Sequence, residues 1–376
     1  MKVVFVSNYF NHHQKSFCEE MYQRLNGEFV FIATTVMRKE RRALGYTQDD
    51  SPKYVLLAYE EKQQMERALA FIDEADVVIV GSAPDEMVSS RIRKGKLTFR
   101  YSERPYKKKA SLLKKFYHFF HWRNRDFWKK NVYMLCAGAY TASDYASVGM
   151  YRNHTYKWGY FPFVYEYDAE KLLYRKKRNT IMWCGRFIDW KHPDDAVAVA
   201  GKLKRDGYDF HLNMIGTGAM EDELKRRVAD MNLGDNVHFL GSMSPEQVRG
   251  YMEEAGIYLF TSDRKEGWGA VLNESMNSGC AIIASHGIGS VPFLIRNGSN
   301  GLIYPSGNIE NLLTHVKYLL DHPDEQKRLG LQAYHTVASQ WNAQIAAERF
   351  CALAKRLRAK KEQYPDLYDE GPCSKV

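Results

Sequence analysis

Short apolar runs alternate with helical patterns along almost the whole chain, and this alternation limits the folds open to it. Such runs are typical of buried strands, and the segments between them carry apolar residues three and four positions apart, as helices do. Strands that alternate with helices form α/β folds with parallel, doubly wound sheets. The predicted strands cover residues 2–7, 28–32, 54–59, 76–80, 96–101, 131–136, 180–184, 210–215, 237–240, 256–262, 281–285 and 301–304.

The alternation pauses once, between Pro162 and Asn179, in a polar segment that is typical of a connection between domains. A chain of 376 residues is long enough for two domains with separate cores. We therefore predict a first Rossmann-like domain over residues 1–163 and a second over residues 164–340. Residues 341–376 are predicted to form a basic amphipathic helix, followed by a tail without pattern that would fray.

Charge and cysteine usage narrow the class of protein further. The net charge is +9, which favours an anionic partner such as a nucleotide, a phospholipid or a nucleic acid. The six cysteines are scattered without a C-x-x-C pair, so free thiols in a reducing cytoplasm are expected and a zinc site is not. The first residues do not resemble a signal peptide, and no run is long enough for a transmembrane helix.

A glycine-rich segment bounded by two glutamates follows the predicted strand at 256–262. Glu266 opens it, Gly267, Trp268 and Gly269 follow, and Glu274 comes eight positions after Glu266. A helix is predicted to begin here, and a helix N-terminus suits a phosphate because its N–H groups are unpaired. Glu274, two turns into that helix, would accept hydrogen bonds from sugar hydroxyls. Taken alone, two glutamates at this spacing are also common in charged helices.

The segment resembles the E-x7-E motif of retaining glycosyltransferases of the GT-B fold, glycosyltransferase family 4. Residues 275–285 also resemble the helix and strand that follow the motif in that family. The resemblance implies two Rossmann-like domains facing across a cleft, with a C-terminal helix that crosses back to the first domain. It also implies that Glu266 contacts the donor sugar, that Glu274 holds the nucleotide ribose, and that the donor lies against Gly267, Trp268, Gly269 and Ala270.

Two cations flank a predicted tight loop after the strand at 180–184. Arg186 and Lys191 lie just before a helix predicted to start at Pro193, and this geometry suits the binding of a diphosphate. The alternative is that Arg186 and Lys191 are two surface cations near a turn. The segment resembles the G-R-x-x-x-x-K pattern of the family, which implies that both cations neutralise the donor diphosphate. Together with Glu266 they form the predicted catalytic set.

Two further loops are predicted to meet the nucleotide. Gly216 and Gly218 form a G-x-G turn directly after the strand at 210–215, which is a suitable place for a nucleotide-facing turn. The resemblance implies that the nucleotide base lies near the loop that ends at Met243, where it would be recognised mainly by backbone groups. The residues after Met243 predict a capped helix N-terminus.

The first domain offers a polar loop at the carboxyl end of its first predicted strand. Asn11, His12 and His13 are candidates for contact with the acceptor or the donor sugar. The alternative is that the two histidines pack against or cap the start of a helix predicted over residues 14–25. The family often has glycines in this loop, and residues 8–13 contain none.

Residues 104–130 are strongly basic and aromatic. They hold ten Lys or Arg residues and eight aromatic residues against one acid, Asp126. This composition on a predicted helix favours contact with an anionic membrane surface. The alternative is a solvated cationic face whose aromatic residues pack on the first domain. No nucleic-acid motif accompanies the stretch, so we do not expect a nucleic-acid partner.

The sequence therefore predicts a retaining, metal-independent glycosyltransferase of the hexosyltransferase type. It would move a sugar from a nucleotide-diphosphate sugar, with UDP favoured and GDP second, to a saccharide or lipid-linked saccharide in bacterial surface-polysaccharide biosynthesis. The protein would be cytoplasmic and peripheral on the inner face of the cell membrane. The nucleotide sugar is a co-substrate, and neither a cofactor nor a metal is expected. A GT-B sugar-nucleotide epimerase and an inactive glycan- or lipid-binding relative remain alternatives.

Overall fold

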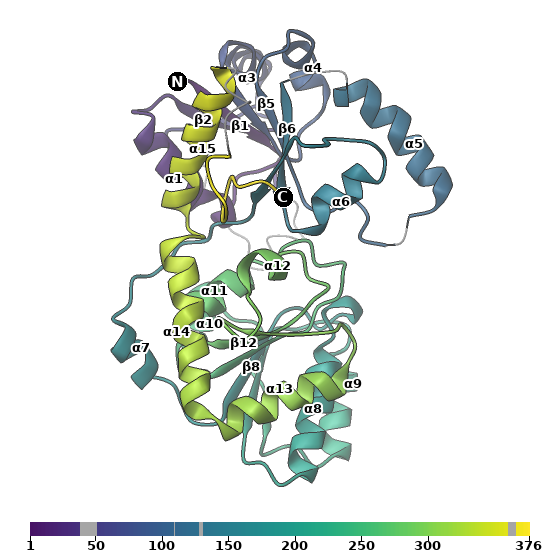
Figure 1. Ribbon diagram of the computed structural model, residues 1–376, viewed down its shortest axis with the longest axis vertical. Coiled ribbons are helices and arrows are strands. Elements are labelled where there is room, and N and C mark those ends of the chain that lie inside the picture. The colour runs from purple at the N-terminus through teal and green to yellow at the C-terminus, as the bar shows by residue number, and fades with distance from the viewer. Residues whose placement is uncertain (38–50, 109, 128–130, 360–365) are drawn as a thin grey trace. The chain divides into compact units, whose positions relative to one another are not determined.

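The computed structural model describes residues 1–37, 51–108, 110–127, 131–359 and 366–376. The chain divides into two compact units (Figure 1), one made of residues 1–163 with 341–376 and the other of residues 164–340. Each unit holds one sheet of parallel strands that is covered by helices. The sequence from Arg38 to Pro52 is polar and unpatterned, which predicts a loop, but this segment lies almost wholly outside the described residues.

The sheet of the first unit has seven parallel strands in the order β3-β2-β1-β4-β5-β6-β7. Its strands are nearly all buried on both faces, which explains why they read as continuous apolar runs in the sequence. The last strand was not predicted, because it mixes polar and aromatic residues. The strands are β1 (Val3–Ser7), β2 (Phe29–Ala33), β3 (Val55–Leu57), β4 (Val77–Val80), β5 (Thr98–Ser102), β6 (Val132–Ala137) and β7 (Thr155–Trp158).

The helices of the first unit come from both ends of the chain. The last of them packs on α1, and the Phe350 and Phe17 ring centroids lie 6.4 Å apart. Figure 1 shows this helix in yellow beside α1. The helices are α1 (His12–Arg24), α3 (Lys62–Glu74), α4 (Glu86–Arg93), α5 (Leu112–Trp122), α6 (Tyr140–Ala146) and α15 (Ala343–Arg358), with a π-helical turn, η1 (Arg123–Phe127), after α5.

The prediction that the C-terminal tail frays is wrong for the described residues 366–376. Cys373 and Ser374 are buried, and the tail runs along the edge of β7. The backbone N–H of Cys373 donates to the carbonyl of Lys157 at 2.8 Å, and the N–H of Lys157 donates to the carbonyl of Ser374 at 2.7 Å. The tail has no hydrophobic periodicity because it is held through its backbone, so the sequence gives little sign of it.

The sheet of the second unit has six parallel strands in the order β10-β9-β8-β11-β12-β13. Its core lies between this sheet and a layer of three helices, α8, α9 and α13. On the other face α10, α11 and α14 pack together (Figure 1). The strands are β8 (Thr180–Cys184), β9 (His211–Ile215), β10 (Val237–Phe239), β11 (Ile257–Phe260), β12 (Ala281–Ser285) and β13 (Leu302–Tyr304).

The helices of the second unit begin where capping residues place them. Pro193 is the first residue of α8, as predicted, and Ser244 and Gln247 form the predicted capping box of α10. The helices are α7 (Ala169–Tyr174), α8 (Pro193–Arg205), α9 (Glu221–Asp230), α10 (Pro245–Glu254), α11 (Val271–Asn277), α12 (Val291–Leu294), α13 (Ile309–Asp321) and α14 (Pro323–Ser339), with a short 3-10 turn, η2 (Asp189–Lys191), before α8.

Both sheets reverse their strand order at one point, between β1 and β4 in the first unit and between β8 and β11 in the second. In open α/β sheets, ligands bind outside the carboxyl ends of the strands at such a switch point. The strand order thus marks one expected ligand position in each unit. Among the described residues, no helix is long and apolar enough to span a bilayer.

Candidate functional site

The switch point of the second unit brings together residues that are far apart in the sequence. β8 and β11 are hydrogen-bonded neighbours, and the loops that follow them carry Lys191 and Glu266. The Lys191 ammonium donates to Glu266 Oε2, and Ser262 Oγ donates to the same oxygen at 3.2 Å. Both charged side chains are largely buried, with 14% and 12% of their surfaces exposed. An ammonium has three N–H donors, so this pairing leaves capacity for a further anion.

A second set of contacts fixes the backbone of the loop that carries Lys191. Thr261, directly after β11, donates through Oγ1 to the Lys191 carbonyl at 2.7 Å and accepts from the buried Trp183 Nε1 at 2.8 Å. The N–H of Asp263 donates to the Trp190 carbonyl at 2.9 Å. The loops after β8 and β11 are therefore tied through backbone and side chain alike.

Trp190 also gathers the two predicted cations. Its ring centroid lies 5.6 Å from the Arg186 guanidinium carbon and 5.0 Å from Lys191 Nζ. Arg186 is exposed and Trp190 is half-buried. The ring thus lies within cation–π range of both positive charges, which repel each other. A diphosphate carries the charge that would offset this repulsion.

Glu274 lies closer to the start of its helix than predicted. Since α11 begins at Val271, Glu274 is in the first turn and not two turns into the helix. Its side chain is half-buried, and burial raises the pKa of its carboxyl group, an effect that Arg249 opposes. Burial, together with the Glu274 carboxylate, raises the pKa of the Cys184 thiol at the end of β8 to about 12.

The glycine-rich segment before α11 offers a ligand mainly backbone groups and few side chains. Gly269 has φ +81°, and a Cβ on it would lie 2.4 Å from the Phe260 ring and 3.2 Å from Glu266 Cγ, so only glycine fits. Trp268 is fully buried and donates through Nε1 to Asn273 at 2.9 Å. Any contact of Trp268 with a donor would therefore come from its backbone, as for Gly267 and Ala270.

The G-x-G turn after β9 lies against the loop that follows β8. A Cβ on Gly216 would lie 1.9 Å from the Gly185 carbonyl oxygen, and one on Gly218 would lie 2.4 Å from that of Phe187. The N–H of Gly216 donates to the Gly241 carbonyl at 2.8 Å, which ties this turn to the loop that carries the half-exposed Met243. The glycines therefore position three loops at one end of the sheet.

In the first unit, Asn11 caps α1. Its side chain accepts from the N–H of His13 at 2.9 Å, and Gln14 completes a capping box. Both histidines lie in the first turn, because α1 begins at His12, two residues earlier than predicted. The His13 ring stacks on Tyr160 with 5.8 Å between centroids, and burial lowers the pKa of His12. Packing and capping thus account for these three residues, and their contact with a sugar stays a prediction.

The basic and aromatic stretch contains the most exposed apolar face among the described residues. Its helix is α5, and Trp122 packs into the core of the first unit. The opposite face carries large side chains that are 51% to 86% exposed: Leu112, Leu113, Phe116, Tyr117 and Phe120. All of these except Leu112 line an open hollow. Lys109 and residues 128–130 lie outside the described residues.

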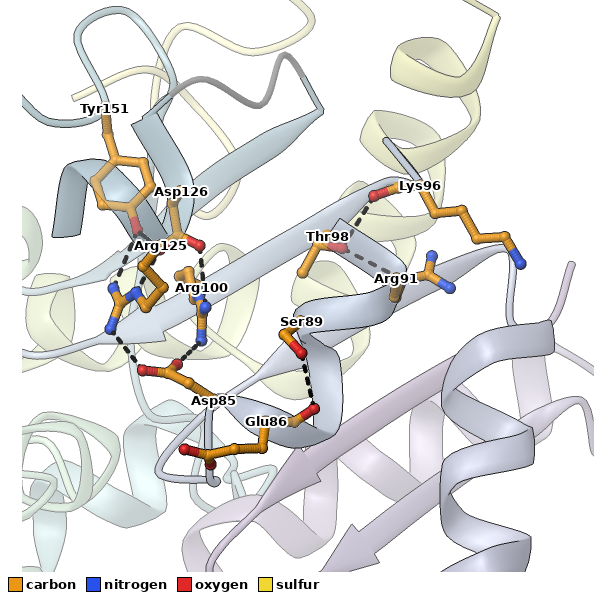
Figure 2. A network of polar contacts seen from close by, with 10 residues as sticks. All are labelled: Asp85, Glu86, Ser89, Arg91, Lys96, Thr98, Arg100, Arg125, Asp126 and Tyr151. Atoms are coloured by element: carbon orange, nitrogen blue, oxygen red, sulfur yellow. Dashed lines mark hydrogen bonds and ion pairs between the residues drawn. The ribbon is translucent and has the colours of Figure 1, made fainter. Parts of the chain in front are cut away.

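A buried charge network fixes the end of α5 to the sheet (Figure 2). Asp126 has no exposed side-chain surface and accepts from Arg100 at 3.0 Å, from Arg125 at 2.7 Å and from the Tyr151 hydroxyl at 2.7 Å. Asp85 accepts from Arg100 on its other side at 2.7 Å. Burial alone would raise the pKa of Asp126, but Arg100 and Arg125 outweigh it and hold the pKa below its ordinary value.

The second unit matches a known family. The profile of the family Glycosyl transferases group 1 covers residues 165–336. Residues 165–336 belong to this family. This glycosyltransferase domain holds the Lys191–Glu266 pair and all of the predicted donor-binding residues. The fold of the whole chain agrees, since solved structures of GT-B glycosyltransferases have the same two parallel sheets flanked by helices.

The chain also resembles individual proteins. It is 28% identical over 182 residues to the amylovoran biosynthesis glycosyltransferase AmsK of Erwinia amylovora, covering 47% of this chain and 44% of that one. It is 22% identical to a GDP-mannose-dependent phosphatidylinositol monomannoside mannosyltransferase of Mycolicibacterium smegmatis, covering 49% of each. The chain thus spans about half the length of the curated relatives it matches.

The solved structures cover much more of the chain at lower identity. The structure of HepE of Anabaena in complex with UDP and glucose superposes on 97% of this chain and on 100% of its own, with a TM-score of 0.65 and 11% sequence identity. A glycosyltransferase of Rickettsia africae covers 96%, with a TM-score of 0.67 and 15% identity. These structures show the fold, α/β and GT-B.

Proposed function

We propose that this chain is a glycosyltransferase that transfers a sugar from a nucleotide-diphosphate sugar. The observation that carries the proposal is the Lys191–Glu266 pair at the β8/β11 switch point of a group 1 glycosyltransferase domain. Arg186 and Lys191 bind the diphosphate, Glu266 contacts the donor sugar, and Glu274 holds the ribose. UDP is the first choice of nucleotide and GDP the second, in line with the UDP bound to HepE and the GDP-mannose dependence of the mycobacterial relative.

Charge stabilisation drives the transfer in this proposal. Negative charge grows on the leaving nucleoside diphosphate as the bond to the sugar breaks, and preorganised cations that face this charge are usually the largest catalytic term. Lys191 is already ordered by Glu266 and by the contact of its carbonyl with Thr261, so little reorganisation is needed when the donor binds. Arg186 adds a planar guanidinium that suits phosphate oxygens.

The reaction is proposed to retain the anomeric configuration without a metal. The diphosphate leaves, the acceptor hydroxyl attacks from the same face, and a leaving phosphate oxygen takes the proton of the acceptor. Two side-chain cations supply the charge that a divalent ion supplies in other phosphate sites. Glu266 is paired with Lys191, so we assign it to sugar binding and not to a covalent intermediate.

The acceptor is proposed to be a saccharide or a lipid-linked saccharide in bacterial surface-polysaccharide biosynthesis. Relatives of this chain include AmsK, an amylovoran biosynthesis glycosyltransferase. The exposed face of α5 supports peripheral binding to an anionic membrane on the cytoplasmic side. Lys114 and Lys115 lie among its exposed apolar side chains, and each basic residue near an anionic surface adds about 1 kcal/mol.

Thermal stabilisation by nucleotides tests the donor site. Purified protein is heated with UDP, GDP, ADP or CMP, and Arg186→Ala and Glu274→Ala are measured in parallel. A ligand at about 100 times its Kd adds about 2.7 kcal/mol to the free energy of unfolding. We expect one nucleoside diphosphate to stabilise the wild type selectively and neither variant. If none of the four nucleotides stabilises the wild type, the active-transferase proposal fails.

Turnover and vesicle binding test the rest. A transferase incorporates the sugar of its donor into a glycan, whereas an epimerase converts the donor alone. For the membrane, Leu113→Ser with Phe116→Ser should weaken binding to vesicles that contain anionic phospholipid and leave nucleotide binding unchanged. Equal binding of this variant and the wild type would remove α5 from the proposal.

A further inference from the structure

A cluster of metal-binding residue types lies at the start of α8, next to the loop that carries Lys191. His192, Asp194 and Asp195 each offer a ligand atom, and these atoms lie within 4.8 Å of one another. Acidic residues in the first turn of a helix favour the helix dipole, and this alone would explain Asp194 and Asp195. If the dipole were the whole explanation, the cluster would not be a metal site.

The burial of Asp195 argues against this simpler explanation. Asp195 has only 8% of its surface exposed, and its Oδ2 has no hydrogen-bond partner among the described residues. Burying an unpaired carboxylate is costly, so such groups are normally paired or bound to a metal. The first turn of a helix would leave a merely dipole-stabilising aspartate in solvent. The dipole explanation thus accounts for the residue type at this position but not for its burial.

A buried hydroxyl from another element also lacks a partner among the described residues. Tyr304, in β13, is fully buried, and its hydroxyl has no hydrogen-bond partner in the described structure. Burial raises the pKa of Tyr304, and the Asp195 carboxylate raises it further. The buried Asp195 oxygen without a partner lies in one cluster with an imidazole and a second carboxylate.

We propose that His192, Asp194 and Asp195 form a binding site for one divalent transition-metal ion. A set of one imidazole nitrogen and carboxylate oxygens suits Mn²⁺ or Zn²⁺, while Mg²⁺ and Ca²⁺ prefer oxygen ligands alone. Asp263 lies 3.7 Å from His192 Nε2, and a carboxylate near a metal-ligating histidine commonly orients its ring. The ion supplies no charge to the diphosphate in this proposal.

The ion would fix the loop at the base of the candidate donor site. His192 adopts a left-handed backbone with φ +49° directly after Lys191, a conformation that is uncommon for residues other than glycine. An ion held by His192 and by α8 would hold this turn in place. The inference goes beyond the proposed function and does not depend on it, because ion binding can be measured without donor or acceptor.

Ion binding to the full chain tests the proposal. EDTA-treated protein is titrated with MnCl2 and with ZnCl2 in a calorimeter, with MgCl2 and CaCl2 as controls. We expect one Mn²⁺ or Zn²⁺ per chain and at least a tenfold weaker affinity in Asp195→Asn, which keeps the side-chain volume. Asp189→Asn is the matched control, because that carboxylate is 78% exposed on the same loop and lies outside the cluster.

Two further variants keep the test decisive. His238→Gln removes the surface imidazole pair with His211, at 3.4 Å, which is a competing place for Zn²⁺. If Asp195→Asn fails to fold, His192→Gln replaces it, and pulsed electron paramagnetic resonance of bound Mn²⁺ should then lose the signal of a nitrogen ligand. No stoichiometric binding, or binding that His238→Gln abolishes and Asp195→Asn leaves intact, would overturn the proposal.

Discussion

Replacement of Lys191 by methionine should weaken nucleoside diphosphate binding while leaving the fold of the second unit intact. Methionine keeps much of the length of the side chain and removes only the charge. A hydrogen bond to a charged group contributes about 1.5–3 kcal/mol, so the loss of one phosphate contact should raise Kd by roughly 10- to 150-fold. Calorimetric titration with UDP and with GDP measures this change.

A second lysine on the neighbouring loop gives a matched control. Lys265 lies 3.3 Å from Asp189, is 29% exposed and carries the same charge, but it does not touch Glu266 in the described contacts. Lys265→Met should change Kd by less than about threefold, as expected for a surface ion pair. If Lys191→Met and Lys265→Met weaken binding equally, only net charge matters. If Lys191→Met binds as well as the wild type, our assignment of Lys191 to the diphosphate is wrong.

Three further predictions concern stability and site geometry. Asp126→Ala removes a buried partner of Arg125 and Arg100 and should lower the free energy of unfolding of the first unit by about 3–5 kcal/mol. Amide hydrogen exchange should become faster in β5 and β6, with little change in β12 as the internal reference. Glu274→Gln should stabilise the nucleotide-free protein near neutral pH. A carboxyl group whose pKa is raised on folding contributes stability at low pH, and this stability is lost as the pH rises through the folded pKa. Thermal melts at pH 4 and pH 8 should show the gain of Glu274→Gln only at pH 8, and nucleotide affinity should fall. Gly216→Ala should destabilise the second unit by about 1–3 kcal/mol and weaken nucleotide binding, because its Cβ would overlap the Gly185 carbonyl. Gly207 has φ +79° and open space around it, so Gly207→Ala should show only the cost of a left-handed backbone for alanine. Equal losses of stability in denaturant titrations of the two variants would contradict this account.

Much of the fold could be predicted because each buried parallel strand is a compact apolar run. β8 and β12 match their predicted ranges at both ends. Local capping chemistry placed the start of α10 for the same reason, since a Ser-Pro-x-Gln pattern acts only on neighbouring residues. β7 escaped prediction because its packing against β6 and the C-terminal tail is not encoded in a period of two.

The candidate site was predictable in its charged residues but not in what orders them. Motif resemblance pointed to Lys191 and Glu266, which lie in contact. Trp190, Thr261 and Ser262 were missed, although each positions one of those groups, because a tryptophan beside two cations and hydroxyls after a strand have no spacing that marks them. Only the adjacency of β8 and β11 brings their loops together.

The assignment of α15 to the first unit has a consequence for how the protein is made. The second unit is continuous in sequence, so all of its strands and helices have been synthesised once residue 340 leaves the ribosome. The first sheet, in contrast, lacks the helix that covers Phe17 and Phe99 until Phe350 has emerged. The domain that begins translation is thus the one completed last, and its exposed apolar face during that interval is a target for chaperones.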